Sequence, residues 1–446
     1  MTTATAEPAT SLHTAAAPST KSRIGLVVLG AVASGLALGL LLVLAVFVGG
    51  PEHEITGAAL FALGSGFVLL ALASRRFTDQ PQDWALVPGL ATAFVGMALF
   101  ALAPGDRALG LAGWVWPILL LVLVGWSFRG VRRSLNGWSR RFVLYPALVV
   151  LGLVALGGAF ETVAEATASN PPLGGRTYLV DGHRLYLHCV GAGAPTVVLL
   201  NGLGERTPSW EWVQQGVSPS TRVCAYDRAG EGWSGGKENG RRLASDLHGL
   251  LRAAHIPGPY VLAGHSVGGV YALLYTARYP DDVAGLALID SSTPYQFDLP
   301  DYPRIYAMLR RLNSVLPSFA RAGIPRLVPG FGTLPPRARQ AASTFGSSPR
   351  ELRANRAELA ELPRMFDEAK AVTTLGGRPL AVLTATVGQQ RGWDTAQDRL
   401  AQLSANSVHR SVPGATHAAL LEDERFAAIT TRAITQVVRH VRSGRR

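Results

Sequence analysis

Long uninterrupted apolar stretches fill the first third of the chain. A helix needs about 20 mostly apolar residues to cross a membrane, and none of these stretches contains an acidic residue, a lysine or an arginine. Five stretches meet that length, at 24–48, 55–73, 84–103, 108–126 and 142–160. The pattern therefore predicts an all-α transmembrane region of five helices over residues 24–165.

Charged residues between the apolar stretches predict the orientation of that region. Basic residues gather before the first stretch, after the second, and between the fourth and fifth. The other loops are mainly acidic and contain Glu52, Glu54, Asp106, Glu161 and Glu165. Positively charged loops usually stay in the cytoplasm. We therefore expect a disordered cytoplasmic N-terminus over 1–23, a multi-pass protein of the cell membrane, and an extracytoplasmic C-terminal domain. Should the second stretch not cross, that domain would be cytoplasmic.

After a linker expected at 166–176, short β-rich runs alternate with helical patterns. The β-rich runs lie at 177–180, 184–190, 196–200, 221–226, 260–263, 283–289, 379–384 and 407–412. Such alternation predicts an α/β domain with a mostly parallel sheet, here over 177–446. The strand pattern stops between about 292 and 377, where an Arg-, Pro- and Leu-rich segment predicts several short helices in the position of a lid.

The segment Gly264-His265-Ser266-Val267-Gly268 carries the strongest chemical signal. It follows an apolar strand and opens an apolar helix, which is the context expected of a G-x-S-x-G nucleophile elbow. A sharp turn from strand to helix strains the backbone at the serine and exposes its hydroxyl, and the flanking glycines let the chain turn that tightly. Ser266 is therefore the expected nucleophile, whereas His265 is expected to be a packing residue.

A serine hydroxyl needs a base to become a nucleophile. Of the ten histidines, His417 has the best setting, because it lies between the last predicted strand and the last predicted helix. A loop at that point can bring an imidazole over Ser266. His417 is therefore the expected general base.

These motifs, in this order, resemble those of the α/β-hydrolases. The segment 201–204 is similar to the family's His-Gly oxyanion loop, with Asn201 in place of the usual histidine. The segment 227–234 is similar to the family's Asp-Arg-x-Gly-x-Gly-x-Ser turn, and 414–423 resembles its histidine loop with an acidic tail. The resemblance covers about 177–446. It implies the α/β-hydrolase fold, an eight-stranded, mostly parallel sheet with helices on both faces and a helical lid.

The resemblance leaves two positions open for the acid of the triad. The usual position is the loop after the strand that follows the lid, and the first carboxylate there is Asp394, close to the next helix. Some members place the acid one strand earlier, where Asp290 ends the run Leu286-Ala287-Leu288-Ile289. We favour Asp290 and keep Asp394 as the alternative. The acid would orient the imidazole and stabilise the imidazolium.

The resemblance also implies an oxyanion hole and a disulfide. The hole would consist of the backbone N–H groups of Val267, at the start of a helix, and Leu203, in the loop after the third strand. The second strand of this fold lies antiparallel beside the fourth, so Cys189 and Cys224 could form a cross-strand disulfide outside the cell. Two buried free thiols are the alternative.

Composition adds limits on the function. Hydrophobic residues make up 48% of the chain and charged residues 16%, as a membrane portion requires. The net charge of +12 comes partly from the cytoplasmic loops, and no nucleic-acid motif accompanies it. We expect a membrane-bound serine hydrolase that cleaves an ester, thioester or amide of a small-molecule or lipid-like acyl substrate. Neither a metal nor an organic cofactor is expected, nor a nucleic-acid partner.

Two other functions remain open. A peptidase that resembles proline iminopeptidase would need an acidic group in the lid to hold the substrate's amine, which Asp298, Asp301 or Glu351 could supply. A non-catalytic sensor or binding module on a membrane scaffold is the second, although the intact serine and histidine argue against it. A dehalogenase or epoxide hydrolase is disfavoured, because those enzymes use aspartate at the position of Ser266.

Overall fold

The computed structural model describes residues 23–167, 174–236, 242–327 and 333–444. Residues 1–22 of the cytoplasmic segment expected over 1–23 lie outside the described residues, as does the centre of the expected linker, 168–173. The chain divides into two compact units. The first comprises the chain up to Leu42 together with Thr56–Ala103 and Ile118–Leu153. The second comprises Val43–Ile55, Pro104–Pro117 and Val154–Arg446.

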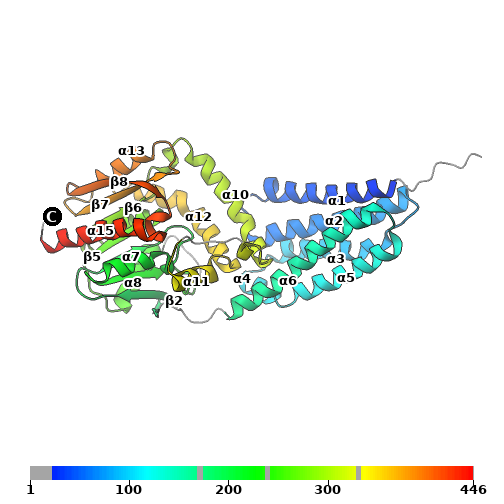
Figure 1. The fold of residues 1–446 in the computed structure, drawn as a ribbon, viewed down its shortest axis with the longest axis horizontal. Helices are drawn as coiled ribbons and strands as arrows, with labels where there is room; N and C mark the ends of the chain where they lie inside the picture. The colour runs from blue at the N-terminus through cyan, green and yellow to red at the C-terminus, as the bar shows by residue number, and fades with distance from the viewer. Residues whose placement is uncertain (1–22, 168–173, 237–241, 328–332, 445–446) are drawn as a thin grey trace, which may run out of the picture. The chain divides into compact units, whose positions relative to one another are not determined.

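From residue 23 onward, the elements of the first unit are helices. They are α1 (Arg23–Leu41), most of α2 (Glu52–Phe77), the single 3-10 turn η3 (Asp83–Ala85), α3 (Leu86–Leu102), α5 (Trp116–Ser134), the π turn η4 (Arg140–Leu144) and the first part of α6 (Tyr145–Thr167). The long helices run alongside one another (Figure 1). Large apolar side chains such as Leu26, Phe94 and Phe142 are exposed on them. Such a surface suits lipid rather than water.

Four helical segments are long and apolar enough to cross a membrane. They are Arg23–Val46, which includes the π turn η2 (Leu42–Val46), Glu52–Phe77, Asp83–Leu102 and Phe142–Thr167. The span expected at 108–126 is not one straight helix. It divides into α4 (Asp106–Ala112) and α5, and a bend of 47° separates them. The count is five only if this bent pair is one span. Pro117 and Gly113 lie at the break, and proline and glycine commonly interrupt helices.

An eight-stranded sheet forms the centre of the second unit, as the sequence predicts. The strands are β1 (Arg176–Val180), β2 (His183–Val190), β3 (Val197–Leu200), β4 (Val223–Asp227), β5 (Tyr260–His265), β6 (Val283–Ile289), β7 (Leu380–Val387) and β8 (Ser407–Thr416). Their order is β1-β2-β4-β3-β5-β6-β7-β8. The pairs β1·β2 and β2·β4 are antiparallel and all others are parallel. The last strand is four residues longer than predicted.

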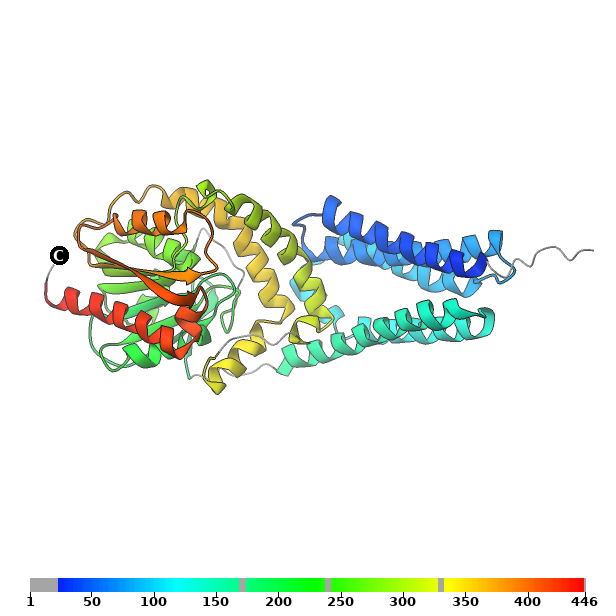
Figure 2. The same cartoon turned by 45° about the horizontal axis from the view of Figure 1, so that its top comes forward.

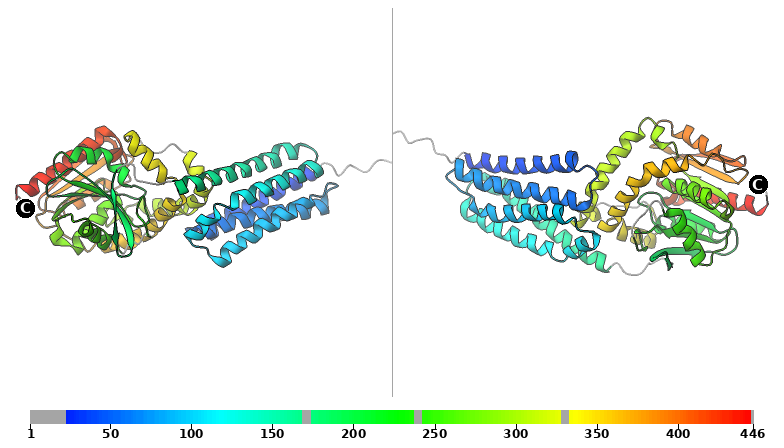
Figure 3. Two further views of the ribbon diagram at one scale, coloured as in Figure 1. Left: turned by 90° about the horizontal axis from the view of Figure 1, so that it is seen from below. Right: turned by 180° about the vertical axis from the view of Figure 1, so that it is seen from behind.

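Helices cover both faces of the sheet (Figure 3). One face carries α7 (Glu211–Val217) and α15 (Glu424–Arg442), and the other carries α8 (Leu243–Ala253), α9 (Val267–Arg278) and α13 (Trp393–Ala401). Short turns complete the layers: η5 (Thr207–Trp210), η6 (Pro280–Asp282) and α14 (Ala419–Glu422). Side chains alternate along each strand, so Val197 and Leu199 of β3 enter one core while Val198 and Leu200 enter the other. The continuous apolar runs of the sequence are therefore buried strands, and helices cover both of their faces.

The lid lies between β6 and β7, as expected. It comprises η7 (Gln296–Asp298), α10 (Tyr302–Arg321), η8 (Ile324–Leu327), α11 (Pro336–Phe345) and α12 (Pro349–Ala369). The helices α10 and α12 lie side by side (Figure 2). The expectation of several short helices is wrong for these two, which have 20 and 21 residues. Each contains a proline, Pro317 and Pro363, that interrupts the sequence pattern without ending the helix.

Both cysteines of the chain lie on adjacent strands. Cys189 on β2 is directly opposite Cys224 on β4, and the two sulfur atoms form a disulfide bond. The cross-strand disulfide expected from the resemblance is therefore present in the structure.

Candidate active site

The turn at Ser266 has the geometry of a nucleophile elbow. β5 ends at His265 and α9 begins at Val267, so Ser266 alone makes the turn. Its φ of 53° and ψ of −128° lie in a region that residues other than glycine rarely adopt, at a cost of about 1–3 kcal/mol. Backbone hydrogen bonds hold the residue there. The Ser266 N–H donates to the Ile289 carbonyl (3.1 Å), and the Ser266 carbonyl accepts from the N–H groups of Ser292 (2.8 Å) and Gly269 (3.1 Å).

The glycines on either side of Ser266 are needed because backbone crowds both positions. A Cβ at Gly264 would lie 2.3 Å from the Gly268 carbonyl oxygen, and a Cβ at Gly268 would lie 2.2 Å from the Leu200 carbonyl oxygen. Backbone cannot move aside as a flexible side chain can. The spacing of the motif therefore has a steric cause in this fold.

The structure brings His417 and Asp290 together. His417 directly follows β8, and Asp290 directly follows β6. The Nδ1 atom of His417 lies 2.6 Å from Oδ2 of Asp290. The His417 ring also lies 4.3 Å, between centroids, from the ring of His265, the residue that precedes Ser266. The imidazole is thus placed beside the residue that precedes the nucleophile, and its Nδ1 atom contacts Asp290.

Asp290 is fully buried, and four donors surround its carboxylate. Besides His417, Oδ2 accepts a hydrogen bond from the Gln389 side chain (3.0 Å), and Oδ1 accepts from the Trp393 indole (2.8 Å) and the Ala385 N–H (3.1 Å). Burial alone would raise the pKa of Asp290, but the hydrogen bonds from His417, Trp393 and Gln389 outweigh it and lower the pKa. Asp290 is therefore an ionised carboxylate in hydrogen-bond contact with the imidazole of His417.

Asp394, the other candidate acid, lies elsewhere. It is exposed in the first turn of α13, whereas its neighbour Trp393 points inward to Asp290. The loop after β7 lacks a carboxylate and contributes Gln389 as a hydrogen-bond donor to Asp290, and Trp393, the first residue of α13, contributes a second donor. The sequence analysis did not identify Gln389 or Trp393 as site residues. The absence of a carboxylate from the loop after β7 is the feature that could have indicated them.

The loop after β3 approaches the nucleophile closely. A Cβ at Gly202 would lie 3.0 Å from the Cβ of Ser266. Asn201 fixes the start of this loop, because its side chain donates to the Tyr226 carbonyl (2.9 Å) and accepts from the Trp210 indole (2.9 Å). Leu203 follows in the turn, and Val267 is the first residue of α9. Both proposed oxyanion donors therefore belong to backbone that borders Ser266.

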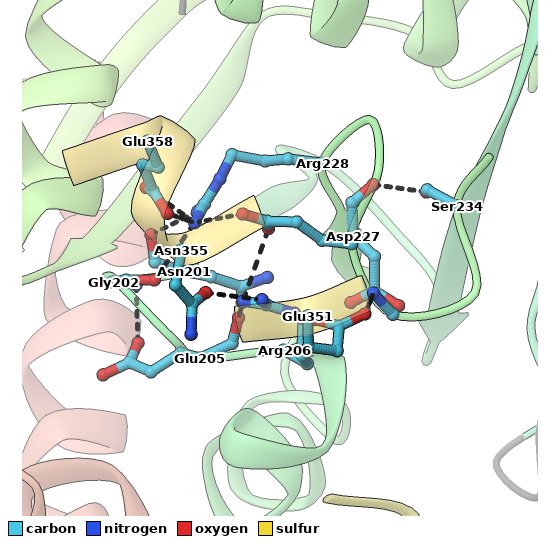
Figure 4. Close-up of polar contacts among 12 residues, drawn as sticks. Asn201, Gly202, Glu205, Arg206, Asp227, Arg228, Ser234, Glu351, Asn355 and Glu358 are labelled. Atoms are coloured by element: carbon cyan, nitrogen blue, oxygen red, sulfur yellow. Dashed lines mark hydrogen bonds and ion pairs between the residues drawn. The ribbon is translucent and has the colours of Figure 1, made fainter. Parts of the chain in front are cut away.

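His265 is a connector rather than a plain packing residue. It is buried; Nδ1 contacts the Glu205 carboxylate, and Nε2 lies 3.1 Å from the His417 carbonyl oxygen. Glu205 in turn accepts a hydrogen bond from the Gly202 N–H (2.6 Å) (Figure 4). Burial opposes the charged form of His265, but the Glu205 carboxylate outweighs it and raises the pKa of the imidazole. The pair thus links the loop after β3 to the backbone of the candidate base.

No three His, Cys, Asp or Glu side chains within the described ranges lie close enough together to hold a metal ion. The polar groups gathered at the carboxyl edge of the sheet are instead a serine, an imidazole, a carboxylate and backbone N–H groups. This set is suited to nucleophilic attack on a carbonyl carbon.

Comparison with known proteins identifies the same fold. Residues 195–329 match the model of the alpha/beta hydrolase fold family. Human monoglyceride lipase is 29% identical over 178 residues, 36% of this chain and 57% of the lipase. The pimeloyl-[acyl-carrier protein] methyl ester esterase of Chromobacterium violaceum is 34% identical over 116 residues, 26% of this chain and 43% of the esterase. The chain thus spans less than two thirds of the length of these relatives.

A solved structure extends the likeness beyond the segment that the family model matches. The Cif epoxide hydrolase from Acinetobacter nosocomialis superimposes with a TM-score of 0.52 at 15% identity, over 64% of this chain and 96% of the hydrolase. At that identity the likeness concerns the fold alone. Together with the sheet order and the family match over 195–329, it shows that the C-terminal domain of this chain has the alpha/beta hydrolase fold.

Proposed function

We propose that this protein is a membrane-bound serine hydrolase. Ser266 attacks an ester, thioester or amide carbonyl, and His417 takes its proton and later returns it to the leaving group. Asp290 orients the imidazole, and the N–H groups of Leu203 and Val267 bind the oxyanion. The observation that carries the proposal is the 2.6 Å contact between His417 and Asp290 beside the strained turn at Ser266.

The surface of the lid favours a lipid-like acyl substrate. Its first helix and the following turn expose large apolar side chains, namely Met308, Leu312, Phe319, Ile324 and Leu327. Exposed apolar surface of this kind is typical of sites that bind acyl chains or membranes. The names of the lipase and esterase relatives point to the same class of substrate.

A peptidase that binds a free amine is less well supported. Glu351, one of the three lid acids available for an amine, is buried and bonded to Arg206 and to the Gly232 N–H. Asp301 pairs with Arg391. Of the three, Asp298 alone is exposed without a competing ion pair in the described part of the chain.

Hydrolysis of a series of p-nitrophenyl esters by the detergent-solubilised full chain tests the substrate class. We expect an initial burst of p-nitrophenol, because an acyl-enzyme accumulates, and a higher kcat/KM for octanoyl than for acetyl esters. Proline p-nitroanilide is the comparison substrate, and its preferred cleavage would favour the peptidase. Folded protein that cleaves neither would favour the non-catalytic binding module.

Contacts within the second compact unit support an extracytoplasmic catalytic domain. Three acids from loops predicted to be outside pair with arginines of the lid: Glu52 with Arg353 (2.8 Å), Asp106 with Arg353 (3.2 Å), and Glu161 with Arg326 (3.0 Å). Those loops are therefore on the same side as the lid. The disulfide fits that side as well, because disulfides persist in oxidising compartments.

The state of the two cysteines in cells tests this orientation. We expect Cys189 and Cys224 to resist a maleimide reagent in denatured, unreduced membranes and to react fully after reduction. A mutant that contains only one of the two cysteines is the control for reagent access. Two freely reactive thiols in unreduced wild type would contradict an extracytoplasmic domain.

A further inference from the structure

A buried cluster of charged side chains joins the lid to the loop after β3. Arg206 and Arg228 come from the loops that follow β3 and β4, and Glu351, Asn355 and Glu358 lie on one face of the lid helix α12 (Figure 4). The spacing of four and three residues places these three side chains on the same face of a helix. The described lid is therefore connected to the body of the domain by buried ions as well as by apolar packing.

Arg228 occupies the centre of this cluster and is 2% exposed. Its guanidinium donates to the Asn201 carbonyl (2.7 Å) and the Gly202 carbonyl (3.2 Å), and to the carboxylates of Glu231 (3.1 Å) and Glu358 (2.9 Å). A buried cation is costly unless it is paired. Glu358 is thus a partner that the lid supplies to a cation of the body.

The two carbonyls that Arg228 binds belong to the peptides that lead into Leu203. The C=O and N–H of a trans peptide point in opposite directions. A guanidinium bound to the Gly202 carbonyl therefore fixes the Leu203 N–H on the side away from Arg228. The bond to the Asn201 carbonyl fixes the Gly202 N–H in the same way, and that N–H binds the Glu205 carboxylate at 2.6 Å.

We propose that Arg228 is a positioning residue, held by Glu358 of the lid, that sets the orientation of the Gly202–Leu203 peptide and thereby forms the oxyanion hole. This inference rests on the proposed function, because it concerns the same oxyanion. It makes the seating of α12 a condition for catalysis rather than only a cover over the site.

Arg206 provides a matched control. It is buried in the same cluster and binds the same helix, through Glu351 and Asn355 (2.8 Å). Its bond to the β3 loop, however, goes to the Glu205 carbonyl, and its bonds do not include the carbonyls before Leu203. Loss of either arginine disturbs the cluster, but only loss of Arg228 frees the Gly202–Leu203 peptide.

The test compares Arg228→Gln, Arg228→Lys and Arg206→Gln in the full chain, with p-nitrophenyl octanoate as substrate. A second readout is the inhibition constant of an octyl trifluoromethyl ketone, which forms a tetrahedral oxyanion with an activated serine. We expect Arg228→Gln to lower kcat about 10²-fold, the loss typical of one oxyanion donor. The inhibition constant of the ketone should rise by a similar factor, whereas KM should stay within about threefold of the wild-type value. Arg228→Lys should recover only a small part, because an ammonium lacks the planar fork of donors.

Arg206→Gln should lower kcat by less than about tenfold. If folded Arg228→Gln and Arg206→Gln lose kcat and ketone affinity equally, the positioning role is wrong and the cluster is only structural. If Arg228→Gln does not fold, Glu358→Gln, which keeps the shape of the side chain, decides: a loss in kcat without a change in KM supports the role, and wild-type kcat overturns it. A wild type that neither binds the ketone nor cleaves the ester overturns the proposed function, and this inference with it.

Discussion

Replacing Ser266 by alanine is expected to abolish covalent labelling by a fluorophosphonate probe and to lower ester hydrolysis by about 10⁵–10⁶-fold. The alanine removes the attacking oxygen, while the backbone that builds the site remains. The positive φ at position 266 strains alanine and serine to a similar extent, so the fold should persist in the variant. Labelling is measured on membranes that contain the full chain, and hydrolysis on the purified protein.

A serine outside the site separates this effect from a general loss of protein. Ser245 lies in the first turns of α8 and its hydroxyl bonds the Arg242 carbonyl. Ser245→Ala should label and hydrolyse like wild type. If Ser266→Ala still labels, another residue is the nucleophile, and the proposed mechanism fails at its first step.

Replacing Asp290 by asparagine is expected to lower kcat by about 10⁴-fold, as an amide in place of the acid does in serine proteases. Asparagine keeps the size of the side chain but offers an N–H₂ group where the imidazole Nδ1–H must donate. The imidazole would then adopt the wrong tautomer or turn away from Ser266. KM should change little, because the Asp290 side chain is fully buried.

Asp394→Asn is the matched control, and it should keep kcat within about twofold of wild type because its side chain is exposed on α13. The reverse result, with Asp394→Asn the slower enzyme, would assign the acid to the other position.

The pH dependence of stability gives a second measurement of the role of Asp290. The pKa of Asp290 is lowered in the folded state, so its carboxylate stabilises the fold above about pH 4 and this contribution is lost as the pH falls further. The melting temperature of Asp290→Asn should lack that acid-dependent part.

The local parts of the site could be predicted from the sequence because their signals are local. The elbow at Ser266 consists of consecutive residues between one strand and one helix, and His417 follows a strand and precedes a helix. Alternation of strands and helices likewise predicts the sheet, with boundaries that differ by a few residues.

The parts that depend on pairing across the fold could not be predicted in the same way. Either of two loops could supply the acid of the triad. The choice between them depends on which strand ends beside the loop that carries His417 after β8. The partners of Arg228 are more distant still: Glu358 lies 130 residues further along the chain, on a helix whose sequence indicates only an amphipathic surface. The bend in the fourth apolar stretch could not be predicted either, because hydrophobic composition alone does not indicate where a helix bends.

The four donors around Asp290 also have a bearing on the reorganisation energy of the reaction. Positive charge would develop on His417 when it takes the serine proton, and a site in water would have to turn solvent dipoles to meet that charge. Here the indole of Trp393, the amide of Gln389 and the N–H of Ala385 already hold the carboxylate in its ionised form. These dipoles are fixed by the fold before substrate arrives, so the cost of arranging them belongs to folding and not to each catalytic cycle.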